Sequence, residues 1–152
     1  ADGNDVMEAS KDLIRYHEEM EIGASDKFDI TGSSEELTMT YEEIFDSVDG
    51  TLEDYVNIYG YYDVFIVCAK HGHVMYTHTR ESDLGENLDV GQLRDTQIAK
   101  LWKTVVSTGK PGISDVGYYP PSNANAQFLG APIRDDNGEI ISVLMLNHFT
   151  PY

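Results

Sequence analysis

The chain has 152 residues, of which 41% are hydrophobic, and this length suits one domain with a single core. Its 27 acidic and 10 basic residues give a formal net charge of −17, which repels nucleic-acid phosphates and anionic lipid headgroups. The one cysteine excludes an intrachain disulfide and any zinc site built from several cysteines. No apolar run reaches the roughly eighteen residues that span a bilayer.

Two long helices are expected in the first sixty residues. Between residues 5 and 22 the apolar side chains recur at spacings of three and four, which is typical of an amphipathic helix. Ser33 and Glu36 stand three apart like a capping box, so a second helix is expected to begin there. The same apolar spacing continues to about Tyr59. Residues 1–60 are therefore predicted to form a helical segment.

From Tyr61 onward the pattern changes to short runs of β-branched and aromatic residues bounded by Gly, Pro and Asn. Residues 61–152 are therefore predicted to form a sheet core. We expect strands at 62–68, 74–78, 113–119, 127–133 and 139–148, with an amphipathic helix at 93–106. The predicted class is α+β, with a five-stranded antiparallel sheet and a helix inserted after the second strand, which is the plan of PAS-like domains.

Several separated motifs occur in one order between Tyr59 and Leu146. They are a strand pair at 59–65 and 72–77, a loop at 81–88, and strand segments at 119–122 and 127–133. Together these segments resemble the PAS-like single Cache domain of bacterial methyl-accepting chemotaxis receptors. The match in order makes the resemblance more specific than any one motif would.

The resemblance implies that residues 1–152 form one periplasmic sensor domain of an inner-membrane receptor. It implies flanking transmembrane helices outside this sequence, a homodimer in the full receptor, no catalytic activity, and a small ligand such as a short organic acid or amino acid. The alternatives are the sensor domain of a histidine kinase or cyclase, or a dimerisation domain without a ligand. An enzyme on a PAS-like scaffold is disfavoured because no catalytic constellation is present. The sequence departs from the family pattern at 125–127 and 147–148.

A small-ligand pocket needs apolar walls with a few directed hydrogen-bonding groups, and tyrosine and tryptophan supply both. We expect this pocket on the sheet face opposite the N-terminal helix. The candidate ligand-binding residues are Tyr76, Trp102, Tyr118, Tyr119, Ser122, Gln127 and Phe128.

Cys68, His71, His73 and His78 are close in sequence and offer donors that transition metals accept. His71 and His73 are expected on a solvent-exposed turn and Cys68 as a buried strand residue, so the sequence favours no metal and no cofactor. A single cysteine before His71 also excludes covalent haem. No nucleophile motif surrounds Ser122, so no catalytic residue is expected.

Overall fold

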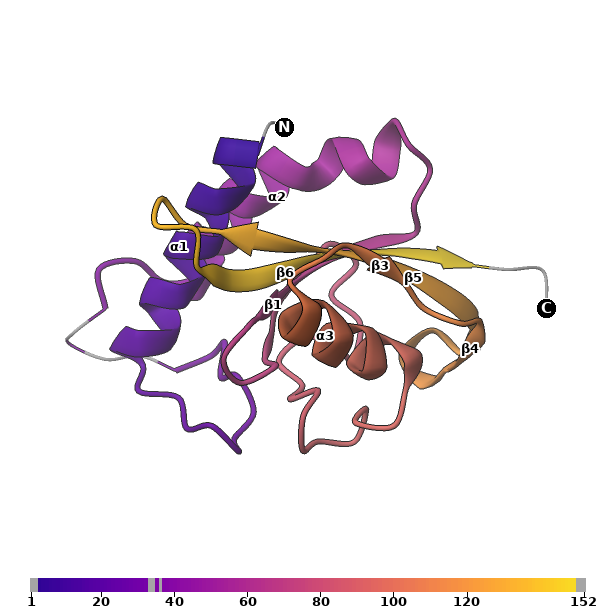
Figure 1. Ribbon diagram of the computed structural model, residues 1–152. Helices are drawn as coiled ribbons and strands as arrows, with labels where there is room; N and C mark the ends of the chain where they lie inside the picture. The colour runs from indigo at the N-terminus through magenta and orange to yellow at the C-terminus, as the bar shows by residue number, and fades with distance from the viewer. Residues whose placement is uncertain (1–2, 33–34, 36, 150–152) are drawn as a thin grey trace.

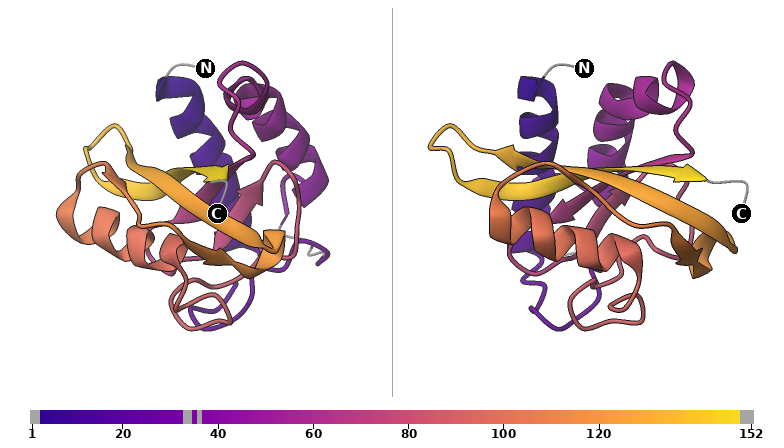
Figure 2. Two further views of the ribbon diagram at one scale, coloured as in Figure 1. Left: turned by 90° about the vertical axis from the view of Figure 1, so that its right-hand side faces the viewer. Right: turned by 45° about the vertical axis from the view of Figure 1, so that its right-hand side comes forward.

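An antiparallel sheet divides the structure into two layers, with α1 and α2 on one face and α3 with long loops on the other (Figure 1). The views in Figure 2 show the same separation after rotation. The computed structural model describes residues 3–32, 35 and 37–149. The predicted α+β class is confirmed. The helices are α1 (Gly3–Glu19), α2 (Tyr41–Asn57), α3 (Gln97–Thr108) and the short 3-10 helix η1 (Pro120–Ser122).

The strand order across the sheet is β2-β1-β6-β5-β3, and β4 also pairs with β5. Each neighbouring pair is antiparallel, and the predicted hairpin is formed by β1 and β2. The strands are β1 (Asp63–Cys68), β2 (Val74–Thr77), β3 (Gly112–Ile113), β4 (Gly117–Tyr119), β5 (Ala124–Arg134) and β6 (Ile140–Phe149).

The prediction of one continuous strand at 113–119 is wrong, because β3 and β4 are separate strands that both pair with β5. The interruption lies at Ser114. Its backbone N–H donates to the carbonyl of Phe128, while its Oγ accepts the N–H of Phe128 at 2.9 Å. A side chain thus replaces a backbone partner at this point, and the regular ladder stops.

The predicted start of the second helix is also wrong. Ser33 and Glu36 lie outside the described residues, but residues 37–40 are not helical and α2 begins at Tyr41. Thr40 is the N-cap, and its hydroxyl accepts the N–H of Glu43 at 3.2 Å. This side-chain bond satisfies one of the free donors of the first turn, so the helix starts here.

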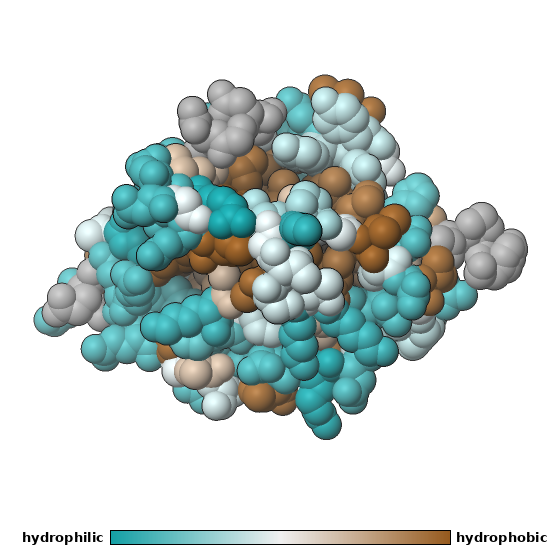
Figure 3. Space-filling view, in the orientation of Figure 1, coloured by the Kyte–Doolittle hydropathy of each residue, from teal (hydrophilic) through white to brown (hydrophobic). Residues whose placement is uncertain are grey.

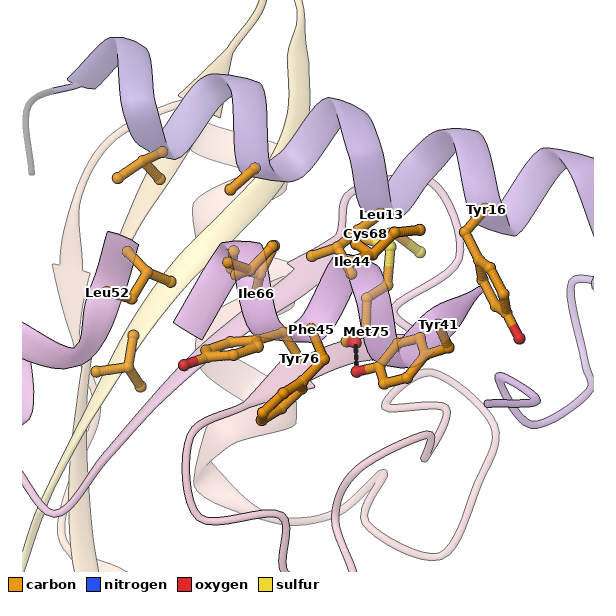
Figure 4. Packing of buried hydrophobic residues seen from close by; sticks show 14 of the residues in the cluster. Leu13, Tyr16, Tyr41, Ile44, Phe45, Leu52, Ile66, Cys68, Met75 and Tyr76 are labelled. Carbon is orange, nitrogen blue, oxygen red and sulfur yellow. Dashed lines mark hydrogen bonds between the residues drawn. The ribbon is translucent and has the colours of Figure 1, made fainter. Parts of the chain in front are cut away.

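Two buried clusters form the core, one on each face of the sheet. Alternating side chains of β1 supply both, since Val64 and Ile66 face α1 and α2 while Phe65 and Val67 face α3. Figure 4 shows part of the first cluster, where Leu13 lies against α2 and the Tyr41 hydroxyl donates to the carbonyl of Met75. This alternation explains why all six residues of β1 are buried.

The face of the molecule in Figure 3 is mainly hydrophilic, as the high net charge implies. Hydrophobic side chains gather above the near edge of the sheet, between the two upper helices. Two hollows, of about 310 Å³ and 240 Å³, are lined by residues that include Tyr55 of α2, Ala131 of β5, and Leu144 and Leu146 of β6. Among the described residues, no helix is both long and apolar enough to cross a membrane.

Candidate functional site

A buried polar cluster lies on the α3 face of the sheet, the face on which we expect a pocket. Asp63 of β1 and Asn147 of β6 are direct register partners, and Phe128 of β5 is the next partner of Asn147. Residues paired across strands share a face, so these three side chains lie side by side. Asp63 is 1% exposed and Asn147 is fully buried.

The loop after β2 brings further acidic groups to this face. Asp63 anchors the loop, because its Oδ2 accepts the hydroxyl of Thr79 at 2.6 Å and its Oδ1 accepts the Thr79 N–H at 3.1 Å. Arg80 then adopts a left-handed conformation with φ of 54°, and its N–H donates to the Thr77 hydroxyl. The turn that follows places Glu81 and Asp83 near Asp63.

Tyr119 connects this loop to β4. Its hydroxyl donates to Oδ2 of Asp83 at 2.7 Å, and both residues are 1% exposed. The ring of Tyr119 packs edge to face on Phe128, with centroids 5.0 Å apart. Beside it, the Ser122 hydroxyl of η1 donates to Oε1 of Glu81 at 3.2 Å. The loop and η1 together cover the cluster.

Three buried polar atoms of this cluster have no hydrogen-bond partner among the described residues: Oδ1 of Asp83 and both amide atoms of Asn147. An unsatisfied buried polar atom costs roughly 1–3 kcal/mol, so such atoms are rare in folded proteins. The arrangement offers a ligand one carboxylate acceptor, one amide acceptor and one amide donor.

The cluster contains several acidic side chains and no basic partner for them among the described residues. Burial, together with the charges of Asp63 and Glu81, raises the pKa of Asp83 to about 7, although the Tyr119 hydrogen bond opposes the rise. Burial also raises the pKa of Asp63, against the hydrogen bonds from Thr79 and Val64. No lysine, arginine or histidine in the described part of the chain forms an ion pair with Asp63, Glu81 or Asp83. The cluster therefore favours a cationic group.

A hollow of about 140 Å³ lies between the loop and η1, close to this cluster. Its lining includes Ser82, Glu86, Pro120 and Pro121. Ser82 and Pro120 adjoin Asp83 and Tyr119 in sequence. Asp83 and Tyr119 themselves do not line the hollow and are 1% exposed, so the hollow does not reach the buried carboxylate.

The structure brings together three of the seven sequence-predicted binding residues, Tyr119, Ser122 and Phe128. Trp102 lies on the same sheet face and packs in the same core cluster, but its Nε1 donates to the carbonyl of Cys68 at 3.0 Å. It therefore lies near the β1–β2 turn, close to Gly72, whose φ is 79°.

The other three predicted residues lie elsewhere. Tyr76 is on the opposite face, where its hydroxyl donates to Asp49 of α2 at 2.7 Å, because it pairs with Ile66 and not with Phe65. Tyr118 is 57% exposed. Gln127 alternates with Phe128, and its Nε2 donates to the carbonyl of Ser114. The expectation that all seven surround one pocket is therefore wrong.

The seven candidate binding residues chosen from the sequence do not include Asp63, Asp83 or Asn147. A signal was present for Asp63, since it is the one charged residue in the strand DVFIVC, where burial on both faces is expected. Asn147 falls at one of the two places where the sequence departs from the Cache pattern. Asp83 carried no comparable signal, because carboxylates in loops are usually solvated.

The expectation of a solvent-exposed histidine turn is wrong for His73, which is fully buried, while His71 is half-buried. The turn folds back under α1, where His17 contacts both rings. Burial is the main cause that lowers the pKa of His17 to about 4, and the positive charges of the nearby His73 and His71 rings lower it further. His78 lies apart from this group and bonds to Asp49 at 2.7 Å.

Comparison with known proteins supports the fold. No family model and no curated protein matches the chain. The sensor domain of the histidine kinase DctB from V. cholerae has 14% identity and a TM-score of 0.54, over 71% of this chain and 38% of that chain. An extracellular ligand binding receptor from Desulfohalobium retbaense has 17% identity and a TM-score of 0.55, over 95% of this chain and 24% of that chain.

This chain thus spans less than two fifths of either structure. It shares the α+β fold of these sensor and receptor domains.

Proposed function

We propose that the chain is an extracytoplasmic sensor domain of a transmembrane signalling receptor, and that it binds a small solute carrying an ammonium group. The observation that carries the ligand class is the buried, unpaired carboxylate oxygen of Asp83, in the same polar cluster as the unpaired amide of Asn147; Asp63 links the two, because it acts on the charge of Asp83 and is the register partner of Asn147. The fold similarity to a histidine kinase sensor domain and to an extracellular ligand binding receptor supports the sensor role.

An ammonium group supplies the donors that this cluster lacks. It would donate to Oδ1 of Asp83, and the neighbouring charges of Asp63 and Glu81 would favour it. The rings of Tyr119 and Phe128 would form an apolar wall of the site, and aromatic rings also attract cations. An organic acid without an amine would instead add negative charge to a buried acidic cluster.

The amide of Asn147 can recognise a second polar group, because it can donate and accept. A carboxylate next to the ammonium group would take the amide N–H, which makes an amino acid the better of the two ligand classes expected from the sequence. The unpaired atoms also disfavour a dimerisation domain without a ligand. In a domain without a ligand, these unpaired atoms would lower the stability of the fold and serve no purpose.

Signalling requires that the ligand bind one conformation better than another. Asp63 and Asn147 lie on β1 and β6, and β6 also contacts α1 from its other face, where the Ser142 and Ser10 hydroxyls are 2.7 Å apart. A shift of these strands would therefore reach the N-terminal helix. The full-length receptor would be a chemotaxis receptor or a histidine kinase. The similarity to the DctB sensor domain supports the histidine kinase as the alternative.

A thermal-shift panel of amino acids, simple amines and matched carboxylic acids, run at about pH 8, tests the proposal. Amine-bearing solutes should raise the melting temperature of the protein, since a ligand that binds only the folded state stabilises it. Asp83→Asn should abolish the increase. Asp115→Asn, which changes an exposed carboxylate, should leave it intact. Equal increases in both variants, or increases only with amine-free acids, would overturn the proposed ligand class.

A further inference from the structure

Three histidines and the one cysteine form a second cluster, on the opposite side of β1 from the acidic cluster. His17 comes from the last turn of α1, Cys68 ends β1, and His71 and His73 lie in the turn before β2. One potential ligand atom from each residue lies within 4.8 Å of all the others. Segments far apart in sequence thus bring four nitrogen and sulfur donors to one point.

The distances suit a single metal ion. Nε2 of His17 is 2.7 Å from Nδ1 of His73, and Sγ of Cys68 is 3.8 Å from the same nitrogen. In a tetrahedral zinc site with bonds of roughly 2.0–2.3 Å, ligand atoms are about 3.3–3.6 Å apart. Small rotations of these side chains would therefore bring the four donors to that spacing.

The tautomer of His73 is fixed for coordination. Its Nε2 lies 2.6 Å from the carbonyl oxygen of Asp26, which can only accept, so Nε2 carries the proton. Nδ1 is then unprotonated and points at His17 and Cys68. A ring N–H held by a backbone carbonyl, with the other nitrogen free, is the usual arrangement of a metal-bound histidine.

The surroundings provide both enclosure and access. Cys68, His17 and His73 are buried, and Figure 4 shows Cys68 between the sheet and α1, beside Leu13. An open hollow of about 340 Å³ is lined by His17, Cys68 and His71. Two acidic residues, Glu18 and Glu139, and one basic residue, Lys70, also line this hollow. The excess of negative charge favours entry of a cation.

We propose that His17, Cys68, His71 and His73 form a binding site for a borderline-soft divalent transition metal, with zinc as the reference ion. The Cys68 thiol loses its proton to solvent on binding, and the metal replaces the His17–His73 hydrogen bond. Because His17 belongs to α1 and the other three ligands to the β1–β2 hairpin, the metal would link the N-terminal helix to the sheet. This goes beyond ligand sensing and does not depend on it.

Zinc titration of the metal-stripped protein, in competition with a chromophoric chelator, measures the stoichiometry and affinity. We expect one equivalent of zinc, and at least a tenfold loss of affinity in both His71→Ala and Cys68→Ala. Both changes should leave the fold intact, since His71 is half-buried and Cys68→Ala removes only the sulfur atom, with the weak hydrogen bond that it accepts from the His73 N–H. Far-ultraviolet circular dichroism of the metal-free variants checks this. His148→Gln, at an exposed histidine, is the matched control and should bind as the wild type does.

Cobalt substitution reports the ligands directly. The wild type and His148→Gln should show the visible bands of tetrahedral cobalt and a thiolate-to-cobalt charge-transfer band, which Cys68→Ala should lack. Asp83→Asn should leave zinc affinity unchanged, so this site and the proposed ligand site can fail separately. The metal site is refuted if the wild type binds no stoichiometric zinc, or if binding survives both His71→Ala and Cys68→Ala.

Discussion

Replacing Asp83 by asparagine should stabilise the empty protein at neutral and higher pH. Asp83 is 1% exposed, and its pKa rises from an ordinary value of 3.8 to about 7, mainly because of burial. A carboxyl whose pKa is raised by folding binds its proton more tightly in the folded state. The contribution of Asp83 to the free energy of unfolding therefore falls as pH rises from about 4 to about 7. Asparagine does not titrate, so the variant lacks this contribution.

The size of the effect follows from the pKa of Asp83. At roughly 1.4 kcal/mol for each pKa unit, full ionisation of Asp83 costs the folded protein about 4 kcal/mol. The asparagine side chain of the variant would keep an oxygen that accepts the Tyr119 hydroxyl, so little hydrogen bonding is lost. We expect Asp83→Asn to match the wild type at about pH 4 and to exceed it by up to about 4 kcal/mol at about pH 8.

Urea unfolding of both proteins across this pH range measures the difference directly. Other carboxylates titrate in both proteins, so the difference between the two curves isolates Asp83. Asp115→Asn serves as the control, and its curve should run parallel to that of the wild type. A constant difference between Asp83→Asn and the wild type at all pH values would show that Asp83 has an ordinary pKa, and would refute the reasoning.

Further predictions concern the cluster and the core. Asn147→Leu should raise stability by about 1–3 kcal/mol in urea unfolding, because it removes two unpaired buried atoms, and should abolish the ligand-induced melting shift. Tyr119→Phe should cost about 1–3 kcal/mol at about pH 8 and less at about pH 4, since the ionised carboxylate loses its donor; equal costs would contradict this. Leu52→Ala should cost about 2–5 kcal/mol by cavity formation without changing ligand affinity, as calorimetric titration would show. Thr40→Ala should lower stability by about 1 kcal/mol in the same unfolding assay, and no loss would argue against the observed N-cap.

The periodicity of apolar residues predicted the order and type of the main elements, because the buried face of a helix or strand requires apolar residues at regular spacings in the sequence. The exceptions arose where a polar side chain replaced a backbone partner. Thr40 caps α2 four residues after the predicted capping box ends, and Ser114 interrupts the predicted third strand. Such local hydrogen bonds involve residues that are equally common in loops.

The site was harder to predict than the fold. Tyr76 and Tyr119 are both buried tyrosines on strands, but strand pairing places them on opposite faces of the sheet. The face depends on register, and a change of one residue in register exchanges the two faces. The approach of His17 to His73, 56 positions apart, depends on how α1 packs and leaves no local signal.

The most direct test of the proposed function is the side-chain amide signal of Asn147 in ¹⁵N–¹H spectra, assigned by its disappearance in Asn147→Leu. Titration with the amino acid that gives the largest melting shift should move this signal in the wild type and leave it unmoved in Asp83→Asn, because the ligand is held by both side chains. If the ligand binds while the Asn147 amide stays unmoved in the wild type, the ligand does not occupy this cluster.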